Sequence, residues 1–240
     1  MHSLPSSSKV KLPRAVLFDY DGVLVSSELI HLSAWKQLLL KLKLPLDLQL
    51  LHETAGKTAP QTLKILLDKF HPGWTERDFN IQELVQLKSN IYLPIAEKEL
   101  QLYPGVVDGL EWLKAAKIPA AVVSNARKLD LETTIRKLGI FHYFEEVISR
   151  DDVPAAKPDP TPYLFAAASL GFLPSDCLAI EDSPTGLEAA LLAKVPVAAV
   201  MTNFSENVLS QPVPGRPDLK PIWVGASLEE FFRWLRTLLR

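Results

Sequence analysis

The stretch LFDYDGVLVSSELIH, residues 17–31, places two aspartates one residue apart, directly after an apolar run. Asp19 and Asp21 are like charges at the end of what reads as a buried strand. Close carboxylates repel each other, so this arrangement costs stability unless a cation or a shared proton relieves it. The pair therefore predicts that other residues of the chain help to offset this repulsion.

Working outward from this stretch, short apolar runs alternate with amphipathic segments. The runs are rich in Val, Ile and Ala, as expected for strands covered on both faces, and their alternation with helical segments predicts an α/β fold around a parallel sheet. We expect strands at 15–20, 119–125, 145–149, 177–182, 195–201 and 221–225, and helices at 103–117, 128–139, 160–171 and 183–194.

The region 26–102 departs from this alternation. It contains three helical patterns, at 28–43, 59–70 and 78–100, and no convincing strand. We therefore expect an α/β core formed by 14–25 and 103–240, an inserted all-helical cap domain at 26–102, and a loose N-terminal tail at 1–13. An insertion at the end of the first strand lies over the carboxyl edge of the sheet, where open α/β folds bind ligands.

Composition narrows the function. The 26 Lys and Arg against 28 Asp and Glu, with no dense basic run, argue against nucleic-acid binding and favour a small-molecule partner. A single cysteine, Cys177, excludes an internal disulfide framework and indicates a reducing compartment, with the cytoplasm as the default. Because no apolar stretch reaches about 18 residues, we expect no membrane span. We expect a monomer or a weak homodimer.

Polar residues follow the expected strands where a parallel sheet gathers its carboxyl ends. Four carboxylates against one lysine leave a formal charge of about −3, which calls for a hard divalent cation, and Mg²⁺ is the usual choice beside a phosphate. Ser124 and the start of the helix that follows it could grip phosphate oxygens, while Lys157 neutralises charge. The residues concerned are Asp19, Asp21, Ser124, Asn125, Lys157, Glu181 and Asp182.

Four motifs in order, DYDGVL, VVSNA, AAKPDP and IEDSPTG, resemble those of the haloacid dehalogenase superfamily, in its helical-cap branch of phosphatases and phosphomutases. The resemblance implies a Rossmann-like core and an Mg²⁺-dependent reaction. It implies that Asp19 attacks phosphorus to form an aspartyl-phosphate and that Asp21 serves as general acid and then base. It also implies metal binding by Asp19, the Asp21 backbone carbonyl and Asp182, with Glu181 ligating or supporting.

These roles set two expectations about protonation. Asp21 must hold a proton near neutral pH, and we expect substrate charge and a neighbouring carboxylate to raise its pKa. Asp19 should stay ionised beside Mg²⁺ and Lys157.

Substrate choice is expected to depend on the inserted region. His31 lies twelve residues after Asp19, and the loop ETAGKTAPQTL carries Gly56 and Lys57. β-Phosphoglucomutases, which the chain also resembles, use an arginine of this loop to hold a second phosphate, whereas the matching position here is Ala59. We therefore predict a phosphatase for a small sugar phosphate or organic acid phosphate. A hexose-phosphate mutase and a catalytically silent binding module are the alternatives.

Overall fold

A computed structural model describes residues 12–238, and a six-stranded parallel sheet forms its centre. The sheet order is β3-β2-β1-β4-β5-β6, so the first strand in the chain lies in the middle. The strands are β1 Ala15–Phe18, β2 Ala120–Val123, β3 Glu146–Ile148, β4 Cys177–Glu181, β5 Val197–Val200 and β6 Trp223–Gly225. This arrangement confirms the predicted α/β class.

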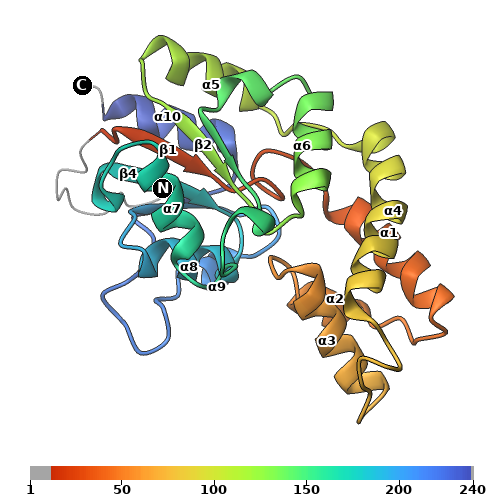
Figure 1. Cartoon of the computed structure of the whole chain (residues 1–240). Coiled ribbons are helices and arrows are strands. Elements are labelled where there is room, and N and C mark those ends of the chain that lie inside the picture. Colours follow the sequence, from red (N-terminus) through yellow and green to blue (C-terminus); the bar gives the residue numbers. More distant parts are fainter. Residues whose placement is uncertain (1–11, 239–240) are drawn as a thin grey trace.

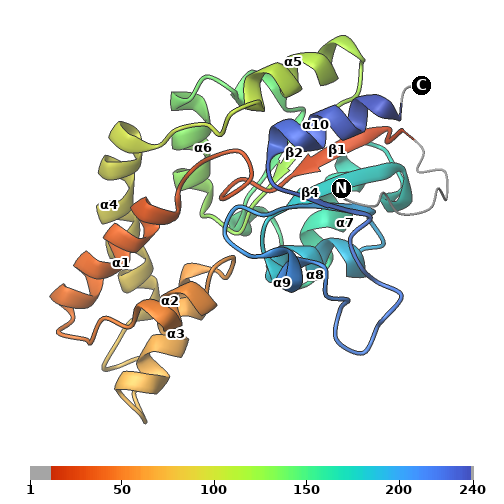
Figure 2. The ribbon, with the colours of Figure 1, turned by 180° about the vertical axis from the view of Figure 1, so that it is seen from behind.

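Both faces of the sheet are covered by helices, which explains why its strands are mainly apolar. Val16 and Phe18 of β1 pack into the cluster formed with α5, α6 and α10, while Ala15 and Leu17 pack into the cluster formed with α7, α8 and α9. Figures 1 and 2 show the two helical layers on opposite sides of the strands. The helices are α5 Val106–Ala115, α6 Lys128–Lys137, α7 Thr161–Ser169, α8 Pro184–Leu192, α9 Glu206–Leu209 and α10 Leu228–Thr237.

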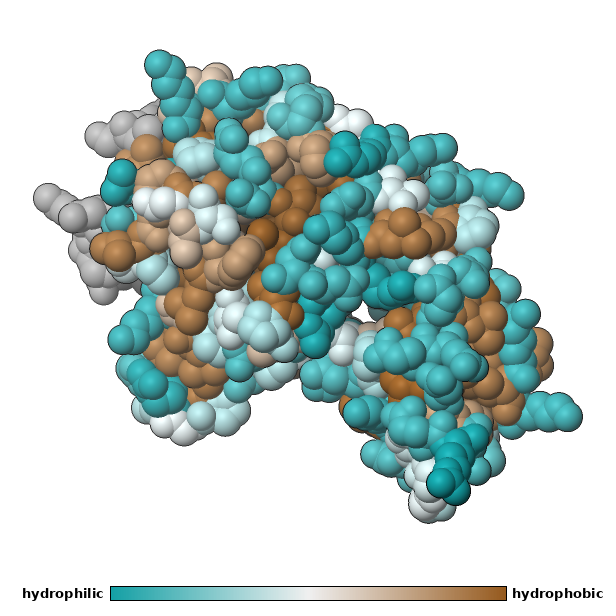
Figure 3. All heavy atoms as spheres, viewed as in Figure 1, coloured by the Kyte–Doolittle hydropathy of each residue, from teal (hydrophilic) through white to brown (hydrophobic). Residues whose placement is uncertain are grey.

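Four further helices stand beside the sheet and pack around their own apolar cluster, which includes Trp35, Leu38 and Leu66. They are α1 Glu28–Lys41, α2 Leu48–Glu53, α3 Ala59–Phe70 and α4 Ile81–Glu99. In Figure 1 these orange and yellow helices lie apart from the two layers that cover the sheet. Figure 3 shows a notch, edged mainly by hydrophilic residues, between the two parts.

The two chain segments that lead into and out of this insertion are hydrogen-bonded to each other. The backbone N–H of Ser26 donates to the carbonyl of Gln101 at 3.0 Å, and that of Tyr103 donates to the carbonyl of Leu24 at 3.0 Å. Val25 and Leu102 form an antiparallel bridge between them. A short paired ribbon therefore joins the two ends of the insertion to the core, and Ile30 of α1 and Tyr92 of α4 also pack into the cluster of the sheet.

The structure differs from the sequence expectations in detail. Each predicted strand is longer than the observed one. For example, β1 ends at Phe18 and β2 at Val123, before the polar residues that follow. Helices α2, α9 and α10 had not been expected, and three short 3-10 turns, Phe141–Tyr143, Arg150–Asp152 and Pro174–Asp176, link other elements. Residues 1–11 of the predicted tail lie outside the described residues. None of the described helices is both long and apolar enough to cross a membrane.

Candidate active site

Three carboxylates meet at the carboxyl edge of the sheet. Asp19 follows β1, Glu181 ends β4, and Asp182 follows it. Because β1 and β4 are adjacent parallel strands, their ends bring these acids together. One carboxylate oxygen of each lies within 4.8 Å of the others, and all three residues are buried. The predicted convergence of Asp19 and Asp182 is therefore present in the fold.

Lys157 supplies the positive charge of this cluster. Its Nζ donates to Asp19 Oδ1 at 2.7 Å and to Glu181 Oε1 at 2.6 Å, and only 2% of the lysine is exposed. The attraction of the two acids outweighs burial and raises the pKa of Lys157, so it is a cation here. Three carboxylates against one ammonium group still leave a formal charge of −2.

Glu181 has most of its hydrogen-bonding capacity in use. Its Oε1 also accepts from the Tyr163 hydroxyl at 2.6 Å, and its Oε2 accepts from the Asp182 N–H at 3.3 Å and from Ser183 Oγ at 3.4 Å. This arrangement favours a supporting role, one of the two that the sequence left open, because few lone pairs remain for a metal ion.

Gly22 makes room for Asp182. Its φ of +81° lies in the left-handed region, and a Cβ there would stand 2.0 Å from Asp182 Oδ2. Only glycine combines this backbone conformation with so close an approach. The DYDG turn thus brings the chain against the acid cluster, which accounts for a glycine directly after Asp21.

The acid cluster has the properties of a cation site. Burial, followed by the charge of Glu181, raises the pKa of Asp19 from its ordinary value to about 8. Burial and the charge of Asp19 likewise raise the pKa of Asp182 well above its usual range. All the donors are carboxylate oxygens, which suits a hard ion such as Mg²⁺. A bound cation would reverse both shifts, so the expectation of an ionised Asp19 depends on that ion.

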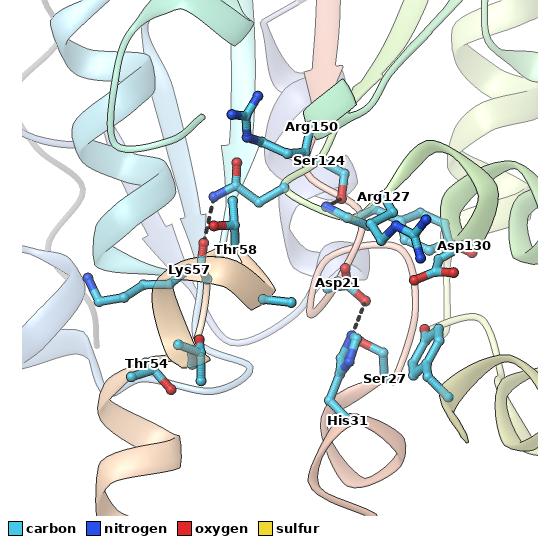
Figure 4. A pocket seen from close by; sticks show the side chains of 18 of the residues that line it. Asp21, Ser27, His31, Thr54, Lys57, Thr58, Ser124, Arg127, Asp130 and Arg150 are labelled. Atoms are coloured by element: carbon cyan, nitrogen blue, oxygen red, sulfur yellow. Dashed lines mark hydrogen bonds and ion pairs between the residues drawn. The ribbon is translucent and has the colours of Figure 1, made fainter. Parts of the chain in front are cut away.

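Asp21 faces away from this cluster, toward the insertion. Its Oδ1 lies 3.2 Å from His31 Nε2, as Figure 4 shows, and His31 Nδ1 lies 2.7 Å from Lys88 Nζ. An ammonium group only donates hydrogen bonds, so Nδ1 accepts and the ring proton sits on Nε2, which donates to Asp21. His31 also stacks on Tyr92 with ring centroids 4.4 Å apart.

The expectation that bound substrate raises the pKa of Asp21 stays a prediction. In the described chain burial raises this pKa, but the hydrogen bond and charge of His31, together with the charge of Lys88, lower it below its ordinary value. The regular strand ends at Phe18, and beyond it the Asp21 carboxylate bonds to His31. The Asp21 carboxylate is therefore outside the acid group, and its predicted metal contact through the backbone carbonyl stays a prediction.

Ser124 and Asn125 follow β2 on the other side of Asp19. Ser124 Oγ accepts from the Ala126 N–H at 3.0 Å, which leaves its hydroxyl hydrogen available for a ligand. Asn125 uses both amide hydrogens, on the carbonyls of Gly56 at 2.8 Å and Lys157 at 3.1 Å, and its Oδ1 accepts from the Lys157 N–H at 3.0 Å. Asn125 thus connects the core to the loop between α2 and α3.

A cavity of about 570 Å³ lies between these strand ends and the insertion. Gly56, Lys57 and Ala59 line it from the insertion, together with apolar side chains such as Trp35 and Val85. The structure thus brings every residue of the predicted site except Glu181 to the wall of one cavity. Glu181 lies behind that wall, under Lys157.

Sequence reasoning missed three contributors: Tyr163, Lys88 and Asn203. Tyr163 on α7 and Lys88 on α4 carry no local signal, because their partners lie 18 and 57 residues away. Asn203 donates from Nδ2 to Asp182 Oδ2 at 2.7 Å. It comes shortly after β5, so the rule that located the other strand-end residues could have located it.

Comparison with known proteins agrees with this geometry. The family described as haloacid dehalogenase-like hydrolase matches residues 13–194. A phosphoglycolate phosphatase of Nitrosococcus oceani is 31% identical, over 83% of this chain and 88% of that protein. A β-phosphoglucomutase of Bacillus subtilis is 30% identical, over 73% of this chain and 78% of that protein.

Solved structures share the fold. A hydrolase from Pseudomonas syringae superimposes with a TM-score of 0.80 at 22% identity, covering 93% of this chain and 98% of that one. CbbY from Rhodobacter sphaeroides in complex with phosphate gives a TM-score of 0.77 at 23% identity, covering 91% and 96%. Together with the acid cluster and the inserted helices, these matches confirm the predicted resemblance: the chain belongs to the haloacid dehalogenase-like hydrolases, in their branch of phosphatases and phosphomutases.

Proposed function

We propose that the chain is an Mg²⁺-dependent phosphatase that acts on a small phosphorylated metabolite, a sugar phosphate or an organic acid phosphate. The observation that carries this proposal is the buried group of Asp19, Glu181 and Asp182 around Lys157, of which Asp19, Asp182 and Lys157 line the cavity. Its surplus of negative charge suits a divalent cation, and the cation makes it possible for a phosphate dianion to approach.

In this proposal Asp19 is the nucleophile. One carboxylate oxygen attacks phosphorus, and the bond to the leaving oxygen breaks, which produces an aspartyl-phosphate. Lys157, bonded to Asp19 Oδ1, holds the carboxylate in place, and Ser124 donates its hydroxyl hydrogen to a phosphate oxygen. Asp19, Asp182 and the backbone carbonyl of Asp21 would hold Mg²⁺, which would supply charge neutralisation to the nucleophile and the phosphate.

Asp21 is the general acid of the first half-reaction and the general base of the second. It protonates the leaving oxygen and then takes a proton from the water that hydrolyses the aspartyl-phosphate. Because its pKa lies below the ordinary value in the free chain, the negative charge of the bound substrate must raise it. His31, whose Nε2 proton points at Asp21, positions this carboxylate.

The cavity size and the relatives support a small substrate. About 570 Å³ is within the range of roughly 300–1,000 Å³ that is typical of small-molecule sites. The similar proteins of known name include phosphoglycolate phosphatases and a phosphorylated carbohydrates phosphatase of Thermotoga maritima. The leaving group is expected to lie toward Lys57, Gly56 and His31.

A sugar phosphomutase is the second candidate, favoured by the similarity to the β-phosphoglucomutase of Bacillus subtilis. A mutase must hold its bisphosphate intermediate while this turns around in the site. Ala59, at the first position of α3 in the cavity wall, offers no charge for a second phosphate. The silent binding module is the less favoured reading, because each predicted core catalytic residue is present.

The setting we propose is a cytoplasmic enzyme, monomeric or weakly dimeric, with no nucleic-acid partner. The near balance of acids and bases and the single buried cysteine support it.

The test is phosphate release from a panel of sugar phosphates and organic acid phosphates, with Mg²⁺ and with EDTA. Release that needs Mg²⁺ and is lost in Asp19→Asn supports the hydrolase. Isomer exchange without release would favour the mutase instead. Absence of both activities, together with no Mg²⁺ binding, would overturn the proposal. Asp159→Asn is a matched control, because the carboxylate of this exposed residue bonds only to Thr161 among the described residues.

A further inference from the structure

Asn203, which follows β5, has one half of its side-chain amide paired and the other half unpaired. Nδ2 donates to Asp182 Oδ2 at 2.7 Å, whereas Oδ1 is buried and has no hydrogen-bond partner within residues 12–238. The orientation of the amide is fixed by chemistry, because a carboxylate oxygen accepts hydrogen bonds and would repel Oδ1. The unpaired atom is therefore the acceptor, not the donor.

A buried acceptor without a partner is uncommon in native proteins and points to a missing donor. Asn203 lines the same cavity as Asp19 and Asp182, so the missing donor belongs to a molecule bound there. Water held by a metal ion fits this description, because its oxygen faces the ion and its hydrogens point outward toward acceptors. Mg²⁺ in particular keeps several of its waters when proteins bind it.

The backbone around Asn203 is held in place. The Met201 N–H donates to the Gly225 carbonyl at 2.9 Å, and the Thr202 N–H donates to the Val200 carbonyl at 3.0 Å. On the other side, Phe204 packs against the cluster beneath the sheet and on His52 of α2, with ring centroids 5.2 Å apart. Asn203 therefore holds its side chain in a defined place with little freedom to move.

We propose that Asn203 is a positioning residue of the metal centre. Its Nδ2 holds the Asp182 carboxylate in one orientation, and its Oδ1 accepts a hydrogen bond from a water molecule bound to the metal ion. This inference rests on the proposed Mg²⁺-dependent function and adds a residue that touches neither the ion nor the phosphorus.

The experiment is calorimetric titration of Mg²⁺ into the full chain, first as wild type and then as Asn203→Ala. We expect the substitution to raise the Kd for Mg²⁺ by about 10- to 100-fold, which is typical when a group that orients a metal ligand is lost. Asn207→Ala is the matched control, because the exposed Asn207 lies four residues further along the same segment and contacts the rest of the chain through its backbone carbonyl. Thermal unfolding in EDTA checks that each variant is folded.

Kinetics separate positioning from a merely structural effect. In Asn203→Ala we expect the Mg²⁺ concentration for half-maximal activity to rise with the Kd, while kcat at saturating Mg²⁺ stays close to that of wild type. A loss of folded protein would instead lower kcat at every Mg²⁺ concentration and leave the Kd unchanged, and this result would overturn the inference.

The remaining outcomes distinguish the two proposals. If wild type does not bind Mg²⁺, the proposed function fails and the inference fails with it. If wild type binds Mg²⁺ and Asn203→Ala binds it equally well, the function stands and the role of Asn203 is refuted. An equal loss of affinity in Asn207→Ala would also refute it, because the effect would then be a general disturbance of the segment.

Discussion

The stability of the metal-free chain should fall as the pH rises, because burial raises the pKa of Asp19 from 3.8 to about 8. Such a group binds its proton more tightly in the folded state than in the unfolded one. Its contribution is therefore complete below the ordinary pKa and is lost as the pH rises through about 8. Between these values the slope is about 1.4 kcal/mol per pH unit for one proton.

From about pH 5.5 to about pH 7.5 this slope amounts to roughly 3 kcal/mol, which lowers the melting temperature of a chain of this size by about 5–10 °C. The measurement is thermal unfolding in EDTA at a series of pH values, compared with Asp19→Asn, in which residue 19 cannot titrate. The difference between the two proteins reports Asp19 together with its effect on the pKa of Asp182, because titrating groups outside the cluster, such as His31 and Lys88, remain in both. Mg²⁺ should restore the loss, and more so at higher pH, because it competes with the proton. Equal pH dependence in the two proteins would refute the reasoning.

Three other substitutions test separate parts of the site. Asp21→Asn should lower the hydrolysis of alkyl phosphates by about 10²- to 10⁴-fold but affect an aryl phosphate less, because an aryl oxide leaves without a proton; steady-state kinetics with both substrate types measure the contrast. Lys157→Met should destabilise the chain by about 3–5 kcal/mol in urea unfolding at neutral pH, because it leaves two buried carboxylates unpaired; a smaller effect in EDTA than in Mg²⁺ would contradict this account. Gly56→Ala places a Cβ 2.8 Å from Ser183 Oγ at a φ of +80°. It should raise KM by disturbing the loop that meets Asn125, and an unchanged KM would show that this loop does not contact substrate.

The parts of the site that could be predicted are those fixed by the sheet. Asp19, Ser124 and Asp182 each follow a buried apolar run, and a parallel sheet places such positions along one edge whatever their separation in the chain. The strands are recognised from their apolar character alone, so the residues that follow them can be located even when the structure of the loops is unknown. This rule does not locate Lys157, because in the sequence this residue does not directly follow a strand. Only its motif, AAKPDP, identified it.

The parts that could not be predicted depend on packing between distant elements. Lys88 meets His31 because α1 and α4 pack side by side, and no local pattern of charge or hydropathy reports that contact. The pKa of Asp21 depends on the same packing, because its carboxylate bonds to His31 instead of joining the three buried acids. In each case a tertiary contact decided the charge environment.

The paired ribbon formed by Leu24–Ser26 and Gln101–Tyr103 has a mechanical consequence. Since the outgoing and returning segments are tied together, bending one bends the other, and a movement of the inserted helices about that ribbon would also have to break the buried bond from Ser89 to Asp130. An inserted segment of another length or sequence could keep the same two neighbouring ends, so the wall that the insertion adds to the cavity can change while the strand-end residues keep their places.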